Sequence, residues 1–405
     1  MEQDEERIRR LTEAISAAHL DALFCRLPHN VLMLTGYWPV LGTATAILTR
    51  DGALALIVPE DELPLARHGW VGKDDTLTFD PVTLDHMGNA WEVTTPLIAD
   101  VARRFRLARA AIGYEGSPDM IPAPYVALHS SVPGTADLCG PVLPDADFWD
   151  ASALLGAQRA VLTPREVAVV QRACAIAAHG FAAVPSLLCR GMTEADVAAA
   201  VHRQIAVRGA SDPDVHHTGV HAFCMSGPRA AEAYRAYART TNRTIEAGDF
   251  VLVHVNSHAD GFWTDLTRTY VLGEPSSRQF TMYEAIFEAR GRALHAIADG
   301  VRAAEVDTVA RHYLKQTGFG AAFKHQLGHG VGYGAIYHGN MPRLHPCSDD
   351  RLQEGMTFNV EPAIYFEGFG GLRHCDVVTV GTDGARVLSP FQSSLADLIV
   401  SERIG

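Results

Sequence analysis

Carboxylate, imidazole and thiol side chains recur in four short segments of the second half of the chain. The segments are Gly261-Phe-Trp-Thr-Asp265-Leu-Thr-Arg-Thr269, His325-Gln-Leu-Gly-His329-Gly-Val-Gly332, Glu361-Pro-Ala-Ile-Tyr365 and Gly371-Leu-Arg-His-Cys375-Asp376. Carboxylates and imidazoles bind divalent cations, and a buried carboxylate or imidazole can move a proton in catalysis. The pattern therefore predicts a site that binds a metal ion or moves a proton.

A predicted β-hairpin adds His254 to this group. Two strand-like runs, 251–256 and 262–267, flank Asp260-Gly261, and Asp-Gly is a strong signal for a two-residue hairpin turn. With these two residues at the centre of the turn, position 254 faces 267 and position 256 faces 265. His254 and Asp265 are then diagonal neighbours on one face, roughly 7–8 Å apart at Cα, and can share a site.

The order of these residues resembles the metal centre of the creatinase/aminopeptidase P family. The resemblance covers residues from about 160 to 395, and the N-terminal half more loosely through 30–36. In that family the hairpin supplies two aspartates eleven residues apart, which is the spacing of positions 254 and 265. The resemblance implies that Asp265, His329 and Glu361 are metal ligands, with Glu361 also acting as the general base.

Two ligand positions of the family hold other residues here. His254 stands in place of an aspartate and removes a charge, while Cys375 stands in place of a bridging glutamate and is a softer donor, better suited to zinc than to manganese. His254 is either a ligand or catalytic group or a structural remnant. Cys375 is a metal thiolate, a buried inert thiol or a reactive nucleophile. We expect at most one zinc or manganese ion, or none.

Further candidates for chemistry come from the same segments. We assign His325 and His338 to catalysis, and the resemblance implies that His338 is a proton shuttle or a substrate contact. Tyr234 stands where the corresponding family segment ends in a substrate-facing histidine. We assign Tyr234 to substrate binding, together with Arg373, which precedes the last ligand position.

A dense imidazole cluster lies outside these motifs. His216, His217 and His221 fall on an expected loop. Either the loop is simply solvated or it forms a second edge that contacts a small molecule. We assign His217 to substrate binding on the second interpretation.

The elements that must position these residues divide near residues 150–162. Before this boundary, helical patterns at 4–18 and 95–106 and apolar runs at 21–25, 30–36, 44–48, 53–58 and 110–114 predict an α/β domain, residues 1–155. After it, Thr163-Pro164-Arg-Glu166 is a capping box that opens a helix to about 188. A second capping box at 193–196 opens a helix that ends near 209, and helices are expected at 279–299 and 303–317.

The resemblance implies an α+β fold for the whole chain. A pita-bread catalytic domain, residues 160–405, should follow the smaller N-terminal α/β domain. In this family the smaller domain of one subunit usually closes the cleft of its neighbour. A homodimer is therefore expected.

Composition excludes several classes of partner. The formal net charge is −13 and no run of Lys and Arg appears, which argues against nucleic acid. The charged N-terminus has no signal-peptide pattern, and no apolar run approaches the roughly 20 residues that span a bilayer. Seven scattered cysteines fit reduced thiols. We expect a cytoplasmic protein that acts on a small-molecule substrate and not at a membrane.

The expected function is hydrolysis of an amide-type C–N bond in a small substrate, at a variant metal site resembling that of Xaa-Pro peptidases. Because Tyr234 replaces the substrate-facing histidine, we expect weak activity on Xaa-Pro dipeptides themselves. Three alternatives stay open: a metal-independent C–N hydrolase of the creatinase or ectoine hydrolase type, a lyase of the dimethylsulfoniopropionate type, and a non-catalytic binding protein of the same fold. Retention of Asp265, His329 and Glu361 together favours an enzyme.

Overall fold

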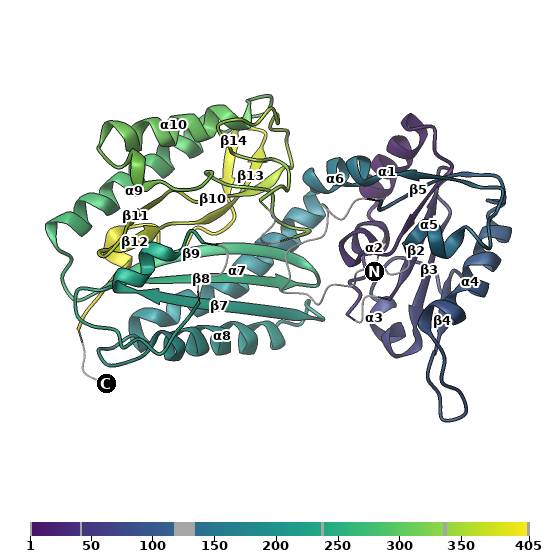
Figure 1. Cartoon of the computed structure of the whole chain (residues 1–405), viewed down its shortest axis with the longest axis horizontal. Helices are drawn as coiled ribbons and strands as arrows, with labels where there is room; N and C mark the ends of the chain where they lie inside the picture. The colour runs from purple at the N-terminus through teal and green to yellow at the C-terminus, as the bar shows by residue number, and fades with distance from the viewer. Residues whose placement is uncertain (1, 41–42, 117–133, 236–238, 335–337, 403–405) are drawn as a thin grey trace. The chain divides into compact units, whose positions relative to one another are not determined.

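The structure is a computed structural model that describes residues 2–40, 43–116, 134–235, 239–334 and 338–402. It divides into two compact units, Met1–Arg159 and Ala160–Gly405. Each unit has its own sheets and helices, which are coloured from purple to blue in the first unit and from teal to yellow in the second (Figure 1).

The first unit is built on one mixed sheet of six strands in the order β4-β3-β2-β1-β5-β6. β1 pairs antiparallel with β2 and parallel with β5. The strands are β1 Ala22–Cys25, β2 Thr45–Thr49, β3 Leu54–Pro59, β4 Thr76–Phe79, β5 Ala111–Tyr114 and β6 Asp147–Asp150. The helices are α1 Glu5–Ala17, α2 Pro28–Thr35, α3 Leu63–Ala66, α4 Ala90–Arg104, α5 Thr135–Cys139 and α6 Ser152–Ala160.

The prediction of a strand at 30–36 was wrong, because this segment belongs to helix α2. All eight helical residues are buried, so the sequence shows an unbroken apolar run without helical periodicity. Pro28 occupies the first turn and Gly36 ends the helix with a left-handed φ of 68°. These two residues are the usual start and stop signals of a helix. The helix expected at 95–106 also starts earlier, at Ala90, where the side chain of Asn89 accepts a hydrogen bond from the Trp91 amide.

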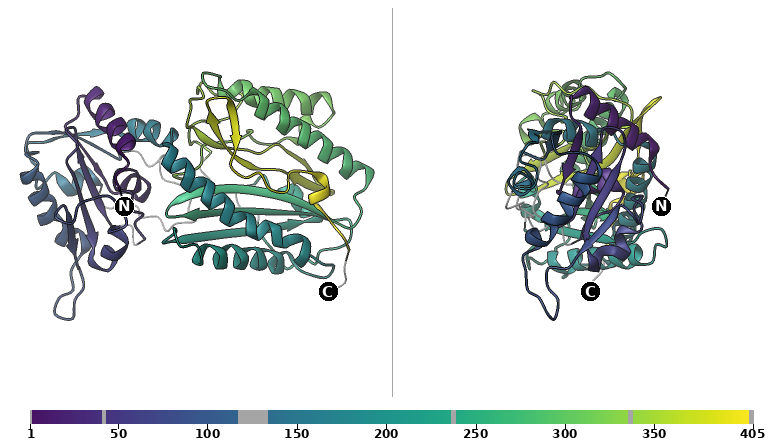
Figure 2. Two further views of the ribbon diagram at one scale, coloured as in Figure 1. Left: turned by 180° about the vertical axis from the view of Figure 1, so that it is seen from behind. Right: turned by 90° about the vertical axis from the view of Figure 1, so that its right-hand side faces the viewer.

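The second unit places its strands between two pairs of helices (Figures 1 and 2). One antiparallel sheet contains β7 Thr218–Ser226, β8 Phe250–Ala259 and β9 Phe262–Leu272, and β15 Ile399–Val400 adds to β9 in parallel. Two smaller sheets complete the layer. They contain β10 Thr357–Val360, β13 Asp376–Gly381 and β14 Gly384–Val387, and the hairpin β11 Ala363–Phe366 with β12 Gly370–Arg373.

Helices α7 Pro164–Leu187 and α8 Glu194–Ala210 pack on the β7–β9 sheet, and α9 Ser277–Ala296 and α10 Ala303–Gln316 lie on the side of β10–β14. Both predicted capping boxes are confirmed, at Thr163 with Glu166 and at Thr193 with Asp196. Helix α7 is long and apolar enough to cross a membrane by length and composition, although half of its most apolar window is buried inside the protein. A core helix has the same properties.

Candidate active site

The β8–β9 hairpin brings His254 and Asp265 together, as the sequence predicted. His254 faces Thr267 and Asn256 faces Asp265 in the observed register. The His254 Nδ1 atom lies 3.0 Å from Thr267 Oγ1 and 3.6 Å from Asp265 Oδ1. Both side chains are largely or fully buried, so this contact is protected from bulk water.

His329 lies near the other carboxylate oxygen of Asp265. Its Nε2 atom lies 3.5 Å from Asp265 Oδ2. The His329 amide donates a 2.7 Å hydrogen bond to Asn359 Oδ1, and the Asn359 amide donates to the His329 carbonyl. A Cβ atom on Gly328 would lie 1.9 Å from the Asn359 carbonyl oxygen. Glycine at 328 therefore lets this segment approach the strand that leads to Glu361.

Glu361 follows strand β10 and is held by its neighbours on both sides. Its amide donates a hydrogen bond to the Leu327 carbonyl, and its Oε2 atom lies 3.8 Å from Arg373 Nη1. The Arg373 guanidinium also donates to Thr267 Oγ1 at 3.0 Å. Arg373 therefore connects the Glu361 carboxylate to the hairpin that carries His254 and Asp265.

The two buried carboxylates have different proton affinities. Burial alone would raise the pKa of Asp265, but the imidazoles of His254 and His329 hold it below its ordinary value. Burial raises the pKa of Glu361; Arg373 opposes this rise and the charge of Asp265 adds to it. Asp265 is thus the fixed anion of the site, and Glu361 is the carboxylate whose proton affinity suits a general base.

The Cys375 thiol is hydrogen-bonded to the backbone of Asp265. A β-bridge pairs Cys375 with Thr267, and the thiol donates to the Asp265 carbonyl oxygen at 3.1 Å. Its sulfur lies 3.9 Å from Asp265 Oδ1. Burial and the negative charges of Asp265 and Glu361 raise the pKa of Cys375 well above its ordinary value. In this arrangement the sulfur keeps its proton.

The donor set suits part of a single metal site. Ligands about 2.1 Å from a tetrahedral ion lie roughly 3.4 Å from one another, close to the His329–Asp265 and His254–Asp265 separations. Within the described residues, no group of three His, Cys, Asp or Glu side chains is arranged to hold an ion. Asp265 and His329 are therefore spaced like two ligands of one ion.

His325 and His338 also lie at this site. His325 Nδ1 is 2.7 Å from the Gln326 carbonyl oxygen, so Nδ1 must carry the hydrogen and Nε2 accepts from the Tyr365 hydroxyl at 3.1 Å. Burial lowers the pKa of His325 to about 3. The His338 ring lies 5.1 Å from the ring of His329. His325 is thus a neutral acceptor, and His338 is an exposed imidazole beside the candidate ligands.

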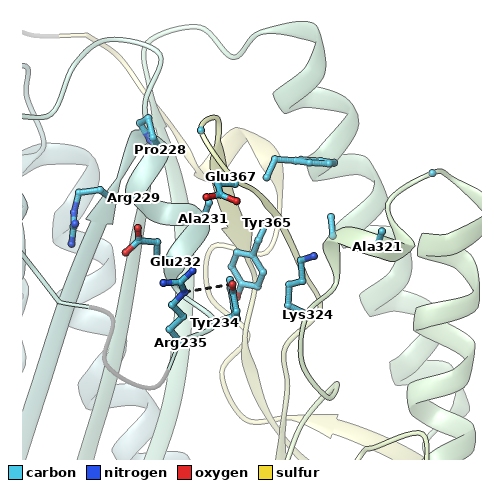
Figure 3. A pocket seen from close by; sticks show the side chains of 14 residues that line it. Pro228, Arg229, Ala231, Glu232, Tyr234, Arg235, Ala321, Lys324, Tyr365 and Glu367 are labelled. Atoms are coloured by element: carbon cyan, nitrogen blue, oxygen red, sulfur yellow. Dashed lines mark hydrogen bonds between the residues drawn. The ribbon is translucent and has the colours of Figure 1, made fainter.

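Tyr234 and Tyr365 line a cavity of about 470 Å³. Their rings pack 5.5 Å apart, and the Tyr234 hydroxyl accepts a hydrogen bond from Arg235 Nε. Figure 3 shows Arg235 and Lys324 on opposite sides of the two rings, with Glu367 above them. The cavity is therefore lined by aromatic rings and by side chains of both charges.

His217 lies farther along the β7–β9 sheet, where its ring stacks on that of His258 at 5.2 Å. The expectation that the whole imidazole cluster lies on a loop was wrong for His221, which belongs to β7. Sequence reasoning also missed Phe223, whose ring stacks on His254 at 5.9 Å. The signal available in the sequence was the alternation of side chains along β7, which places Phe223 and His221, two positions apart, on the same face.

Comparison with known families decides the classification. Residues 168–382 match metallopeptidase family M24, and residues 7–161 match the creatinase/prolidase N-terminal domain. The chain belongs to metallopeptidase family M24. This confirms the resemblance seen in the sequence, and it identifies a family whose members use divalent metals.

Relatives of this M24 protein are named as dipeptidases. An Xaa-Pro dipeptidase of Pyrococcus furiosus is 27% identical over 390 residues, covering 96% of this chain and 99% of the relative. A probable dipeptidase PepE of Mycobacterium tuberculosis is 35% identical over 236 residues, covering 58% and 60% of the two chains. The M24 protein is therefore a peptidase-type hydrolase of C–N bonds, as the sequence predicted.

Solved structures confirm the α+β fold, with a pita-bread domain after a smaller N-terminal domain. The prolidase from Pyrococcus furiosus has a TM-score of 0.72 at 27% identity and covers 94% of this chain and 99% of its own. The Xaa-Pro dipeptidase from Bacillus anthracis has a TM-score of 0.77 at 24% identity, covering 98% and 99%. The M24 protein thus has the architecture of these enzymes over nearly its whole length.

Proposed function

We propose that the protein hydrolyses the peptide bond of dipeptides or closely similar amides, with Glu361 as the general base. The observation that carries this proposal is that the surroundings of the two buried carboxylates shift their pKa values in opposite directions. Asp265 is held as an anion by two imidazoles, whereas burial raises the pKa of Glu361. A carboxylate with raised proton affinity is able to take a proton from an attacking water near neutral pH.

The proposed site holds one divalent ion, zinc or manganese, at Asp265, His329 and Glu361. When bound, such an ion supplies Lewis-acid polarisation of the scissile carbonyl. The surrounding residues orient the donors. Asn359 fixes the backbone of His329, and Arg373 faces the Glu361 carboxylate.

The cavity beside Tyr365 suits the carboxylate end of the substrate. Arg235 and Lys324 offer positive charge at its two sides, and the rings of Tyr234 and Tyr365 offer an apolar surface between them (Figure 3). Glu232 and Glu367 line the same cavity. They oppose a second negative charge, so a substrate with one carboxylate is favoured over one with an acidic C-terminal side chain.

Steady-state kinetics on a panel of dipeptides tests this function. The metal-free protein, and the protein loaded with zinc or manganese, are each assayed with free and C-terminally amidated dipeptides. We expect metal-dependent turnover, weaker on Xaa-Pro than on other dipeptides, and a higher KM for the amidated forms and for Arg235→Ala and Lys324→Ala. Absence of turnover on every dipeptide in all three metal states would contradict the proposal.

One observation favours metal-independent hydrolysis as a second candidate. The Cys375 thiol donates its hydrogen to the Asp265 carbonyl, so the residue in the place of a bridging carboxylate is engaged elsewhere. The chelator arm of the same assay separates the candidates. Turnover that survives complete metal removal supports the metal-independent reaction.

A further inference from the structure

Glu194 is a fully buried carboxylate that lies outside the candidate active site. It is the first residue of helix α8, between the capping-box residues Thr193 and Asp196, and its side chain is inaccessible to solvent. A helix N-terminus favours a negative charge. A buried carboxylate is nevertheless costly unless it is well hydrogen-bonded. The partners of Glu194 therefore show what this residue holds in place.

Five donor groups surround the Glu194 carboxylate. Its Oε1 atom accepts hydrogen bonds from the Ser226 amide at 2.7 Å and from the Ser226 hydroxyl at 3.1 Å. Its Oε2 atom accepts from the Thr241 amide at 2.9 Å, from the Thr241 hydroxyl at 2.6 Å and from Arg229 Nε at 3.4 Å. All five groups donate, so the site requires a side chain that only accepts, which is an ionised carboxylate.

These contacts join the two ends of one segment of the chain. Ser226 is the last residue of β7, and Thr241 follows the turn that leads toward β8. Within the segment, Arg229 Nη2 donates a 2.6 Å hydrogen bond to the Arg239 carbonyl. We call residues 226–241, of which the structure describes 226–235 and 239–241, the wall segment. Glu194 fixes both ends of the wall segment to the start of α8.

The wall segment forms one side of the charged cavity. It includes η3 (Gly227–Glu232) and the residues that follow it. Figure 3 shows several of its side chains around the cavity. The cavity-lining residues that belong to it are Pro228, Arg229, Ala231, Glu232, Tyr234 and Arg235. The position of Arg235, one of the two cations proposed to bind the substrate carboxylate, therefore depends on how this segment is held.

The wall segment is blocked on its other side by strand β12. A Cβ atom at Gly371 would lie 2.2 Å from the Ala230 carbonyl oxygen, so η3 already packs directly on this strand. If its ends were released, the segment could move only away from β12. Because β12 pairs with β11, which carries Tyr365, this movement would separate Tyr234 from Tyr365 and widen the cavity.

We infer that Glu194 is a positioning residue for substrate binding: it holds the wall segment so that Arg235 meets the substrate carboxylate. This inference rests on the proposed dipeptidase function. Glu194 acts through the wall segment, so its loss should weaken binding of the substrate carboxylate more than it slows the chemical step.

Glu194→Gln tests this role with little change in side-chain volume. The glutamine amide donates where an oxygen accepted, so at least two of the five donors would face another donor. We expect KM for Ala-Ala to rise roughly tenfold or more, the loss of about one hydrogen bond to a charged group. kcat should fall less than about threefold, because Asp265, His329 and Glu361 lie on other elements. KM for Ala-Ala amide, which lacks the carboxylate, should change less than about threefold.

Asp212→Asn is the matched control. Asp212 is also a buried carboxylate, lies just beyond the opposite end of α8 and pairs with Arg172 and Arg208. This variant loses comparable ion pairs without touching the wall segment, so it should keep the wild-type KM for both substrates.

A pair of variants at Thr241 tests the same contact without changing the buried charge. Thr241→Val removes the hydroxyl that donates to Glu194 and should raise KM for Ala-Ala. Thr241→Ser keeps the hydroxyl and should retain the wild-type KM. This pair keeps the inference open to contradiction if Glu194→Gln does not fold.

Hydrogen exchange measured by mass spectrometry separates failure of this inference from failure of the proposed function. Glu194→Gln and Thr241→Val should exchange faster than the wild type in peptides that cover 226–241, whereas Asp212→Asn should not. If no dipeptide is hydrolysed, this local difference alone decides whether Glu194 holds the wall segment. Unchanged exchange in both variants would overturn the inference. So would an unchanged KM for Ala-Ala, or an equal rise of KM for Ala-Ala and its amide.

Discussion

The Cys375 sulfur lies 3.1 Å from the carbonyl oxygen of Asp265 and 3.9 Å from the Oδ1 atom of the same residue. The thiol therefore satisfies a backbone acceptor immediately beside the carboxylate that carries the charge of the site. Position 375 is where the resemblance placed a bridging glutamate. In this protein the position stabilises the hairpin through its hydrogen bond.

Replacing Cys375 by serine should have little effect on metal binding. A serine hydroxyl can donate to the Asp265 carbonyl as the thiol does, and neither group is then a ligand. We expect the affinity for zinc, measured by calorimetry, to change by less than about tenfold. Removing a residue that only hydrogen-bonds to a metal ligand typically lowers metal affinity by about tenfold or more, so a smaller change means that position 375 does not contribute to binding. Cys347→Ser, at an exposed thiol, is the control. A larger loss specific to Cys375→Ser would show that the thiolate binds the metal.

Restoring carboxylates at both exchanged positions should create a second metal site. The wild type is expected to bind at most one equivalent of divalent metal. In the double variant His254→Asp, Cys375→Glu, the added carboxylate oxygens supply the donors that a second ion lacks. The metal content measured by elemental analysis after dialysis should therefore rise from one equivalent per chain or less to two. Two equivalents in the wild type would contradict the expected stoichiometry.

Replacing Glu361 by glutamine should abolish catalysis without unfolding the protein. Glutamine keeps the volume of the side chain but cannot accept a proton, and a positioned general base contributes typically ~10²–10⁴-fold. We expect kcat to fall at least ~100-fold, with little change in melting temperature. Glu354→Gln, at an exposed position, is the control. Full activity in Glu361→Gln would place catalysis elsewhere.

The features that the sequence predicted correctly depend on local rules. A capping box needs only four residues, and the Asp260-Gly261 turn alone determines that His254 faces Thr267. The diagonal contact between His254 and Asp265 follows directly from that register. Predictions of this kind succeed because the interacting groups are close in sequence.

The features that the sequence did not predict depend on packing between distant segments. Helix α2 is buried on every side, so its apolar run carried no helical period. The Cys375 hydrogen bond depends on a bridge to Thr267, more than 100 residues away. The stacking of Phe223 on His254 requires the alignment of β7 with β8, and no turn signal joins these two strands.

A buried ion pair beside the site should make stability depend on pH. Asp376 accepts hydrogen bonds from Arg268 at 2.7 Å and from Arg290 at 2.5 Å. Burial alone would raise the pKa of Asp376, but Arg268, His374 and Arg290 hold it well below its ordinary value. A lowered pKa means that the stabilisation is complete above the unfolded value of about 3.9 and is lost as the pH falls below it.

We therefore expect Asp376→Asn to lower the free energy of unfolding at pH 7 by about 3–5 kcal/mol, because two guanidinium groups lose their buried counter-charge. The difference from the wild type should shrink below about pH 4. Chemical unfolding followed at a series of pH values measures this. Asp383→Asn, at an exposed turn, should show no such difference. A constant difference at all pH values would contradict the assigned role of the Asp376 charge.

The last prediction concerns the residue that faces the substrate. Tyr234 is 36% exposed, packs on Tyr365 and lines the charged cavity, in the place where the family resemblance puts a substrate-facing histidine. A tyrosine ring projects farther than an imidazole and narrows the space for a proline ring. It also lacks an imidazole nitrogen that can hydrogen-bond near the scissile bond.

Tyr234→His should therefore raise kcat/KM for Ala-Pro by roughly tenfold or more. Tyr234→Phe removes the hydroxyl but keeps the ring, so it should leave this activity low. If both variants hydrolyse Ala-Pro as slowly as the wild type, position 234 does not limit activity on Xaa-Pro substrates.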